Sequence, residues 1–271
     1  MSDRRPNRFA PSLQALDARE VPAVILNTLA DGSTEVFIND LGSGADTIVV
    51  RDFGNGTVAG QDNAISFSAS NVTKIRINTE GGNDAVRYEL IGSLQDGRQM
   101  SVEVGLGSNF DPTVGNDRFE AILDSGVTLG NKSNLSISAD GGNGRDYLSV
   151  TAIDVNVRPD ATLKTVLVGG YDDDTIAQLF RYGTNYGTVD MESYGLSGAD
   201  TIRQYAEFGA ASTGHTVQLA YGGDGADTAN VTLIAPTTMT IDDAELFGDN
   251  GPADTYVDTF LNATPNVTVH Q

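Results

Sequence analysis

The sequence has no cysteine, which excludes a disulfide framework, thiolate chemistry and a cysteine metal site. It has no apolar run of about 18 residues, so no segment is predicted to span a bilayer. Basic residues are scarce, with 16 Lys and Arg against 37 Asp and Glu. The resulting net charge of −21 argues against nucleic acid, whose phosphates would be repelled, and against an anionic membrane surface. The negative charge favours cations or basic molecules as binding partners.

Groups for catalysis are also few. The two histidines are His215, in a loop that enters a strand, and His270, next to the last residue. No nucleophile-elbow, zinc-protease, phosphate-loop or dinucleotide motif is present. Paired acids such as Asp242 and Asp243 are expected by chance in so acidic a chain, so they are poor evidence for a glycosidase. The sequence therefore predicts a protein that is not an enzyme.

What the sequence does contain is a repeat. A glycine-rich turn that ends in aspartate, seen in Gly222-Gly223-Asp224-Gly225-Ala226-Asp227, recurs along the whole chain. The closing aspartates are Asp46, Asp84, Asp117, Asp146, Asp174, Asp200, Asp227 and Asp254, spaced 38, 33, 29, 28, 26, 27 and 27 residues apart. Self-similarity at a nearly fixed period of this size predicts a repeat architecture.

Apolar and polar residues alternate on both sides of each turn, as in Thr201-Ile202-Arg203-Gln204-Tyr205, which predicts half-buried strands. A unit of strand, loop, strand and turn this small must stack on its neighbours to bury its apolar face. Propeller blades are longer and have tryptophan signatures, whereas this chain has no Trp. We therefore predict an all-β fold: a right-handed parallel β-helix (β-solenoid) of about eight coils with one Gly-Asp turn edge.

In such a solenoid the closing aspartates lie above one another, about 4.8 Å apart. The electrostatic repulsion between these carboxylates must be compensated. Ca²⁺, which binds six to eight oxygen ligands, is one candidate. The alternative is that each aspartate accepts hydrogen bonds from N–H groups of its own loop and needs no metal. The arginines beside the acidic turns are expected to form ion pairs and not to act as lyase bases: Arg76, Arg118, Arg145 and Arg203.

The turns resemble the hemolysin-type (RTX) calcium-binding repeat, G-G-x-G-x-D-x-U-x, most closely at 222–229 and 141–148. The resemblance implies Ca²⁺ as the cofactor and these metal ligands: Asp146 and Asp227 first, then Asp46, Asp174 and Asp200, with Asp84, Asp117 and Asp254 in copies of altered length and Asp172 and Asp224 nearby. The chain departs from that family because its motif occurs once in about 27 residues, whereas the family's nonapeptides run in tandem. The pattern is a degenerate form of the repeat.

Residues 1–23 differ in composition from the single repeat domain predicted for 24–271. They resemble the N-terminal segment of many exported or surface repeat proteins of planctomycete bacteria, through Arg4-Arg5, Leu13, Leu16 and Val21-Pro22-Ala23. That resemblance implies an extracellular or cell-surface location, and the alternative is a disordered basic tail. After it, strands at 23–26 and 34–38 around Asp31-Gly32 predict a hairpin that caps the first coil.

Three functions fit these observations. The first is a non-enzymatic secreted or cell-surface structural or adhesive domain, stabilised by calcium at the stacked turns and able to bind polysaccharide or other surface proteins. The second is a polysaccharide-binding or polysaccharide-lyase-like β-helix, whose exposed tyrosines would stack on sugar rings. The third is a spacer that needs no cation and whose turns are closed by hydrogen bonds alone.

Overall fold

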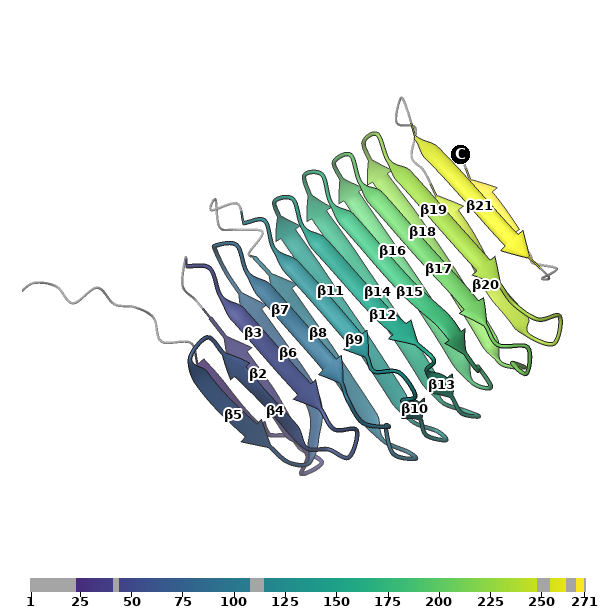
Figure 1. Ribbon diagram of the computed structural model, residues 1–271. Coiled ribbons are helices and arrows are strands. Elements are labelled where there is room, and N and C mark those ends of the chain that lie inside the picture. The colour runs from purple at the N-terminus through teal and green to yellow at the C-terminus, as the bar shows by residue number, and fades with distance from the viewer. Residues whose placement is uncertain (1–22, 41–43, 108–114, 248–253, 262–266, 271) are drawn as a thin grey trace, which may run out of the picture.

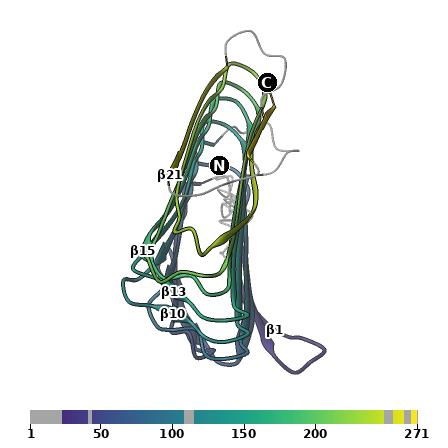
Figure 2. The ribbon, with the colours of Figure 1, turned by 90° about the vertical axis from the view of Figure 1, so that its right-hand side faces the viewer.

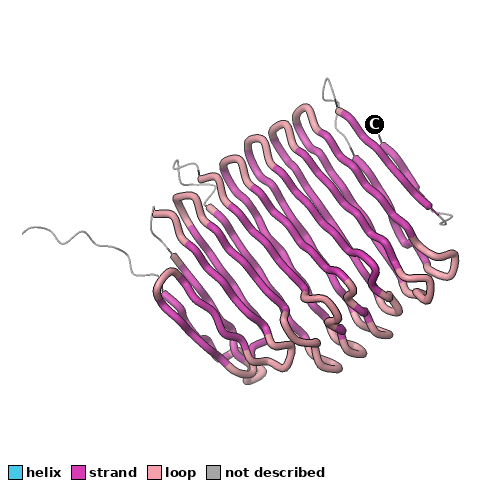
Figure 3. Tube along the Cα trace, viewed as in Figure 1, coloured by secondary structure: helices cyan, strands magenta, loops and turns pink. Residues whose placement is uncertain are grey.

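The structure is a computed structural model that describes residues 23–40, 44–107, 115–247, 254–261 and 267–270. Strands and loops make up this described part (Figure 3), and none of its elements is a helix that could cross a membrane. The predicted N-terminal segment, apart from Ala23, lies outside the described residues, as do residues 41–43, 114 and 248–253 of three turn copies.

The strands form two large, mostly parallel sheets, which extend along the molecule and face each other across the core (Figure 1). Sheet A has the spatial order β1 (Ala23–Thr28), β2 (Thr34–Asn39), β6 (Val72–Thr79), β8 (Gln99–Leu106), β11 (Asn134–Asn143), β14 (Thr162–Tyr171), β16 (Thr188–Ser197), β18 (His215–Asp224), β20 (Thr240–Phe247) and β22 (Val267–His270). Sheet B has the order β21 (Thr255–Leu261), β19 (Thr228–Ile234), β17 (Thr201–Phe208), β15 (Thr175–Gly183), β12 (Tyr147–Ile153), β9 (Arg118–Leu123), β7 (Ala85–Leu90), β3 (Thr47–Asp52), β4 (Val58–Asp62) and β5 (Ile65–Ala69).

The chain alternates between the two sheets, so that each turn of the coil contributes one strand to each. Strand β11, for example, lies between β8 and β14 in sheet A, while the next strand, β12, lies between β9 and β15 in sheet B. All these pairs are parallel, which confirms the predicted parallel β-solenoid. The regular part of the solenoid amounts to about six turns, slightly fewer than the eight expected, and antiparallel hairpins are added to its first turns.

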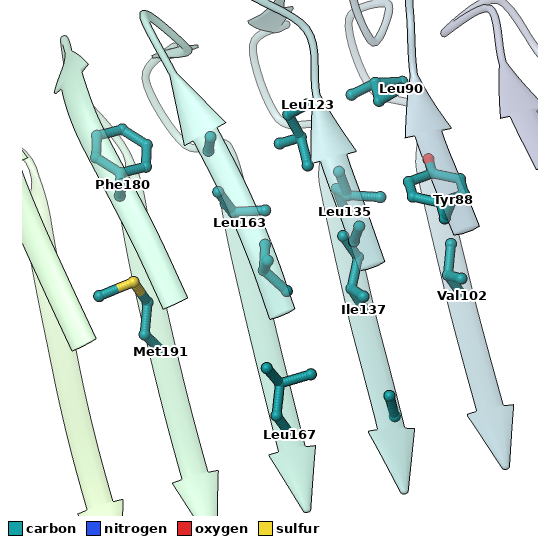
Figure 4. Close-up of a cluster of buried hydrophobic side chains, with 14 of the residues drawn as sticks. Tyr88, Leu90, Val102, Leu123, Leu135, Ile137, Leu163, Leu167, Phe180 and Met191 are labelled. Atoms are coloured by element: carbon teal, nitrogen blue, oxygen red, sulfur yellow. The ribbon is translucent and has the colours of Figure 1, made fainter. Parts of the chain in front are cut away.

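The period-two alternation of the sequence determines which side chains enter the core. In β11, Leu135, Ile137 and Ala139 are buried between the sheets while the residues between them are half-exposed. Figure 4 shows such side chains from both sheets meeting in the interior, among them Phe180 and Leu163. Because each small coil covers the core of the next, stacking supplies the burial that one repeat cannot provide alone.

Antiparallel hairpins cover the N-terminal end of both sheets. The predicted hairpin is confirmed as β1 and β2, which pair with Ala23 opposite Asn39, and its turn is closed by the Gly32 N–H and the Leu29 carbonyl at 3.0 Å. The sequence did not predict a second one, in which β4 folds back on β3 and β5 on β4. This second hairpin places Asp62 opposite Ile48, at the start of sheet B.

The two edges of the flattened coil differ. Figure 2 shows the sheets as its long sides, with the β1 hairpin projecting at one corner. The Gly-Asp turns lead from sheet A into sheet B along one edge, as in the passage from β11 to β12. The other edge holds longer loops and a small sheet of β10 (Thr128–Leu129) and β13 (Asn156–Val157). The repeated motif therefore occupies a single edge, as the spacing predicted.

Candidate functional site

All eight closing aspartates lie in one column at the Gly-Asp edge, which we call the aspartate ladder. Each stands directly before a strand of sheet B, so the parallel register of that sheet fixes its height: Asp46, Asp84, Asp117, Asp146, Asp174, Asp200, Asp227 and Asp254. The column includes the copies of altered length, because the strands that follow Asp84, Asp117 and Asp254 keep the common register of sheet B.

Hydrogen bonds connect each ladder aspartate to the next coil. The backbone N–H of Asp146 donates to Oδ1 of Asp174 at 2.8 Å, and the N–H of Asp174 donates to Oδ1 of Asp200 at 2.8 Å. The same bond recurs at all seven steps of the ladder, at N–O distances of 2.7 to 2.9 Å. At the first rung, where no described coil precedes, Nδ2 of Asn63 donates to Oδ1 of Asp46 at 2.6 Å.

The backbone carbonyls of the ladder complete the connection. The carbonyl of Asp146 accepts the N–H of Thr175, which follows Asp174, at 2.9 Å. Each coil thus contacts the previous aspartate twice, through one carboxylate oxygen and through the next backbone N–H. The carboxylate takes the place of a backbone carbonyl at the corner, where the chain leaves one sheet for the other. Hydrogen bonding is therefore the observed role of Oδ1, but the donor belongs to the neighbouring coil and not to the aspartate's own loop.

The glycine five residues before the aspartate makes room for the second carboxylate oxygen. A Cβ on Gly141 would lie 2.5 Å from Oδ2 of Asp146 and 2.4 Å from the carbonyl oxygen of Gly169. A Cβ on Gly169 would likewise lie 2.4 Å from Oδ2 of Asp174. Real Cβ contacts are not this short, so no residue with a side chain fits here without displacing the carboxylate. The spacing between glycine and aspartate is thus a packing requirement.

Burial makes the ladder carboxyls unusual acids. Asp146 is 3% exposed and Asp174 is 2% exposed, and Oδ2 of each is buried without a hydrogen-bond partner among the described residues. Burial, and to a lesser extent neighbouring carboxylates, raises the pKa of both groups to about 8, against the lowering effect of the N–H bond. The pKa of Asp117 is raised to about 7 and that of Asp200 to about 6, again mainly by burial. At neutral pH the two middle rungs, Asp146 and Asp174, therefore favour the protonated form.

Three of the arginines that the sequence placed near the acidic turns pair with acids outside the ladder. Arg145 forms an ion pair with Asp173 at 2.8 Å, Arg118 with Glu120 at 2.6 Å, and Arg76 with Glu35 at 3.4 Å. Within the described ranges, the ion pairs do not include five rungs of the ladder: Asp84, Asp117, Asp146, Asp174 and Asp200. The expected arginine pairs exist for these three side chains, but they do not neutralise the ladder.

The ladder does not have the geometry of the calcium site that the resemblance implies. Ca²⁺ needs several oxygens converging at about 2.3–2.6 Å. From Asp84 onward, each rung instead has Oδ1 bonded to a backbone N–H, and at Asp146 and Asp174 the other oxygen lies in the space that a glycine leaves. No group of three acidic or histidine side chains within the described ranges is arranged around a metal position. Asp172 and Asp224 lie exposed in the turns, outside the ladder. Calcium binding at the stacked turns stays a prediction.

Sequence reasoning missed two carboxylates at the N-terminal end of the ladder. Asp40 follows β2 and Asp62 ends β4, and both are buried near Asp46. Neither belongs to a repeat copy, and the second hairpin that brings Asp62 to this edge was not foreseen. The weak signal available was that both are acids at strand ends.

Comparison with known proteins adds no relative: no family model, curated protein or solved structure matches this chain.

The glycine requirement predicts that Gly169→Ala destabilises the protein by about 1–3 kcal/mol, since the new methyl group would overlap Oδ2 of Asp174. Gly105→Ala is the matched control, because a Cβ there would meet only Oδ1 of Asn78, at 3.5 Å. Denaturant unfolding measures both, and the control should stay within about 0.5 kcal/mol of the parent. Equal stability of the two variants would show that the ladder has no such packing constraint.

The raised pKa values of the middle rungs predict that stability in EDTA falls as pH rises. The folded pKa of Asp146 and Asp174, about 8, lies above the unfolded value of about 4. The folded state therefore binds more protons between these values, and this contribution to stability is lost as pH rises through the folded pKa. Melting temperatures from pH 5 to 9 test this. The double variant Asp146→Asn, Asp174→Asn should show a flatter profile, and an unchanged slope would contradict the assignment.

Proposed function

We propose that the chain is a non-enzymatic structural or adhesive domain of an extracellular or cell-surface protein. The observation that carries the proposal is the unbroken connection of successive coils, with sheet pairing on both faces and one aspartate bond at every step of the ladder. Such an architecture gives a long, regular surface and a stiff spacer.

The chemistry of the described side chains supports a role without catalysis. His215 is exposed and its Nδ1 lies 3.1 Å from both carboxylate oxygens of Asp242, with no nucleophile among the hydrogen bonds of this pair. Lys164 is held by Asp190 at 2.8 Å and by Glu192. These groups are engaged in ion pairs on the outer surface. In cells that produce the protein, fractionation should recover it from the medium or the envelope, and recovery from the cytosol alone would contradict the proposed location.

Calcium stabilisation is part of this proposal. It is supported by the net charge of −21 and by buried carboxylates, such as Asp84 and Asp117, that form no ion pair within the described residues. Within the described part of the ladder, however, no set of ligands converges on one metal position. A cation that binds the folded state alone raises the free energy of unfolding in proportion to the logarithm of its concentration.

We therefore expect EDTA to lower the melting temperature at pH 7.5 by many degrees and low-millimolar Ca²⁺ to restore it. The measurement is a thermal melt followed by circular dichroism, with Mg²⁺ at the same concentration as the control for ionic strength. Identical melts with and without chelator would remove calcium from the proposal and leave the spacer closed by hydrogen bonds.

Polysaccharide binding is a second candidate, favoured by a shallow depression of about 350 Å³ on the outer face of sheet A. Its lining includes Arg76, Asn78 and Asp140 around Gly105, which has no side chain. Aromatic stacking does not add to it: the rings of Tyr194, Tyr221 and Phe247 are 6.4 and 5.8 Å apart and pack against one another along the sheet. The depression therefore offers polar groups to a sugar, with one cation among them.

If this depression binds an acidic polysaccharide, Arg76→Gln should abolish the retardation of the protein in gels that contain polygalacturonate. Arg203→Gln is the control, because Arg203 is exposed on the opposite sheet. Retardation that is equal for both variants, or absent for the parent, would reject this candidate. Release of unsaturated products would instead indicate a lyase.

A further inference from the structure

The N-terminal end of the ladder differs from its middle because two additional carboxylates reach it. Asp40 follows the end of β2, and its N–H donates to the Asn78 carbonyl at 2.9 Å. Asp62 is brought there by the antiparallel pairing of β4 with β3. Together with the first two rungs, Asp46 and Asp84, they form what we call the end cluster. The four carboxylates come from four separate places in the chain.

The side chains of the end cluster are buried. Their exposed fractions are 3% for Asp40, 9% for Asp46, 0% for Asp62 and 2% for Asp84. Asp46 and Asp40 lie within hydrogen-bonding reach of each other, and Asp84 is close enough to Asp46 to repel its charge. Asp62 is repelled by both Asp40 and Asp46. The cluster therefore concentrates like charges in a space from which water is excluded.

Asp62 is the member that most needs a partner. Both of its carboxylate oxygens are buried and form no hydrogen bond within the described residues, whereas every rung from Asp84 to Asp254 has Oδ1 bonded to a backbone N–H. A buried carboxylate with neither oxygen satisfied is strongly unfavourable unless a proton or a cation compensates it. Because no hydrogen bond holds its side chain, Asp62 can turn toward a ligand without breaking one.

No cationic side chain within the described residues compensates Asp46 or Asp62. Neither Lys nor Arg is among the groups that influence these two carboxyls electrostatically. Neither of them takes part in an ion pair within the described ranges. These two buried acids therefore have acidic neighbours and no basic partner.

We propose that Asp40, Asp46, Asp62 and Asp84 bind one divalent cation, with Ca²⁺ as the best fit, at the N-terminal end of the ladder. The ion is a hard cation that accepts carboxylate oxygens in a flexible geometry. Within the described residues no three acids are already arranged around a metal position, so binding would require these side chains to adjust. This inference rests on the calcium part of the proposed function, which it narrows from eight stacked turns to one site.

The test is calcium titration of the whole chain by isothermal calorimetry at pH 7.5, after removal of metal with EDTA. We expect one ion per chain. Asp62→Asn should weaken binding by about tenfold or more, because it removes a charged ligand. The matched control is Asp174→Asn, a rung whose Oδ1 is already bonded to a backbone N–H, and it should bind calcium like the parent.

A second readout separates a ligand from a merely structural residue. In EDTA, Asp62→Asn should melt above the parent, since it removes a buried charge, and calcium should no longer raise its melting temperature. If Asp62→Asn does not fold, Asp40→Asn is measured in the same way, with the same expectation. If the variant measured, Asp62→Asn or Asp40→Asn, binds calcium as tightly as the parent, the proposed site is wrong.

The outcomes distinguish this inference from the proposed function. Several ions per chain, with affinity lowered equally by Asp62→Asn and Asp174→Asn, would overturn the single site and keep calcium at the stacked turns. Absence of heat and of any melting shift in the parent would overturn both calcium statements. In that case the structural role of the solenoid would still stand, because the connection between coils does not require a metal.

Discussion

The structure depends on a hydrogen bond that continues a parallel sheet around a corner. Where the chain passes from sheet A to sheet B, its backbone changes direction, and an N–H that would have found a carbonyl in the next strand loses it. The carboxylate of the next coil supplies the missing acceptor, as Asp174 does for the N–H of Asp146. Because every step has such a bond, two neighbouring coils cannot shift relative to one another without breaking the bond between them.

This solution places carboxylates in a buried row, and the structure offsets their cost differently along the ladder. Each Oδ1 is satisfied by N–H, but Oδ2 of Asp146, for example, lies in the space that glycine leaves, without a hydrogen-bond partner among the described residues and within range of neighbouring carboxylates. A proton on that oxygen removes the repulsion, which agrees with a pKa raised by burial. At the end cluster additional acids are present, and neither carboxylate oxygen of the buried Asp62 has a hydrogen-bond partner within the described residues.

Much of this arrangement could be predicted from the sequence. The period of 26 to 29 residues and the alternation around each turn led to parallel stacking and to aspartates in one column, because a fixed period places equivalent residues at equivalent heights. The identity of the donor could not be predicted, since sequence spacing does not say whether an N–H of the same loop or of the next coil is nearer.

Asp62 was missed because its position depends on β4 folding back, and the stretch Val58-Ala59-Gly60-Gln61-Asp62 has no clear alternation. The buried Gln178, which donates to Ser193 at 2.9 Å inside the core, was missed for a different reason: its strand alternates normally, but a polar residue occupies an inward-facing position.

The fixed distance between glycine and aspartate explains why the turns resemble a calcium-binding repeat. In this chain, glycine is required because a Cβ on Gly169 would overlap the carboxylate of Asp174, and aspartate is required because a backbone N–H needs its Oδ1. Both requirements are met without metal, so the motif alone does not distinguish a cation site from a hydrogen-bonded corner.

The copies of altered length support this view. Asp84 and Asp117 make the same bonds, at 2.9 and 2.7 Å, as the regular copies, so the ladder tolerates insertions that would disturb a shared set of metal ligands. What distinguishes a cation site here is the convergence of additional carboxylates, and within the described part of the ladder the end cluster is where Asp40 and Asp62 provide it.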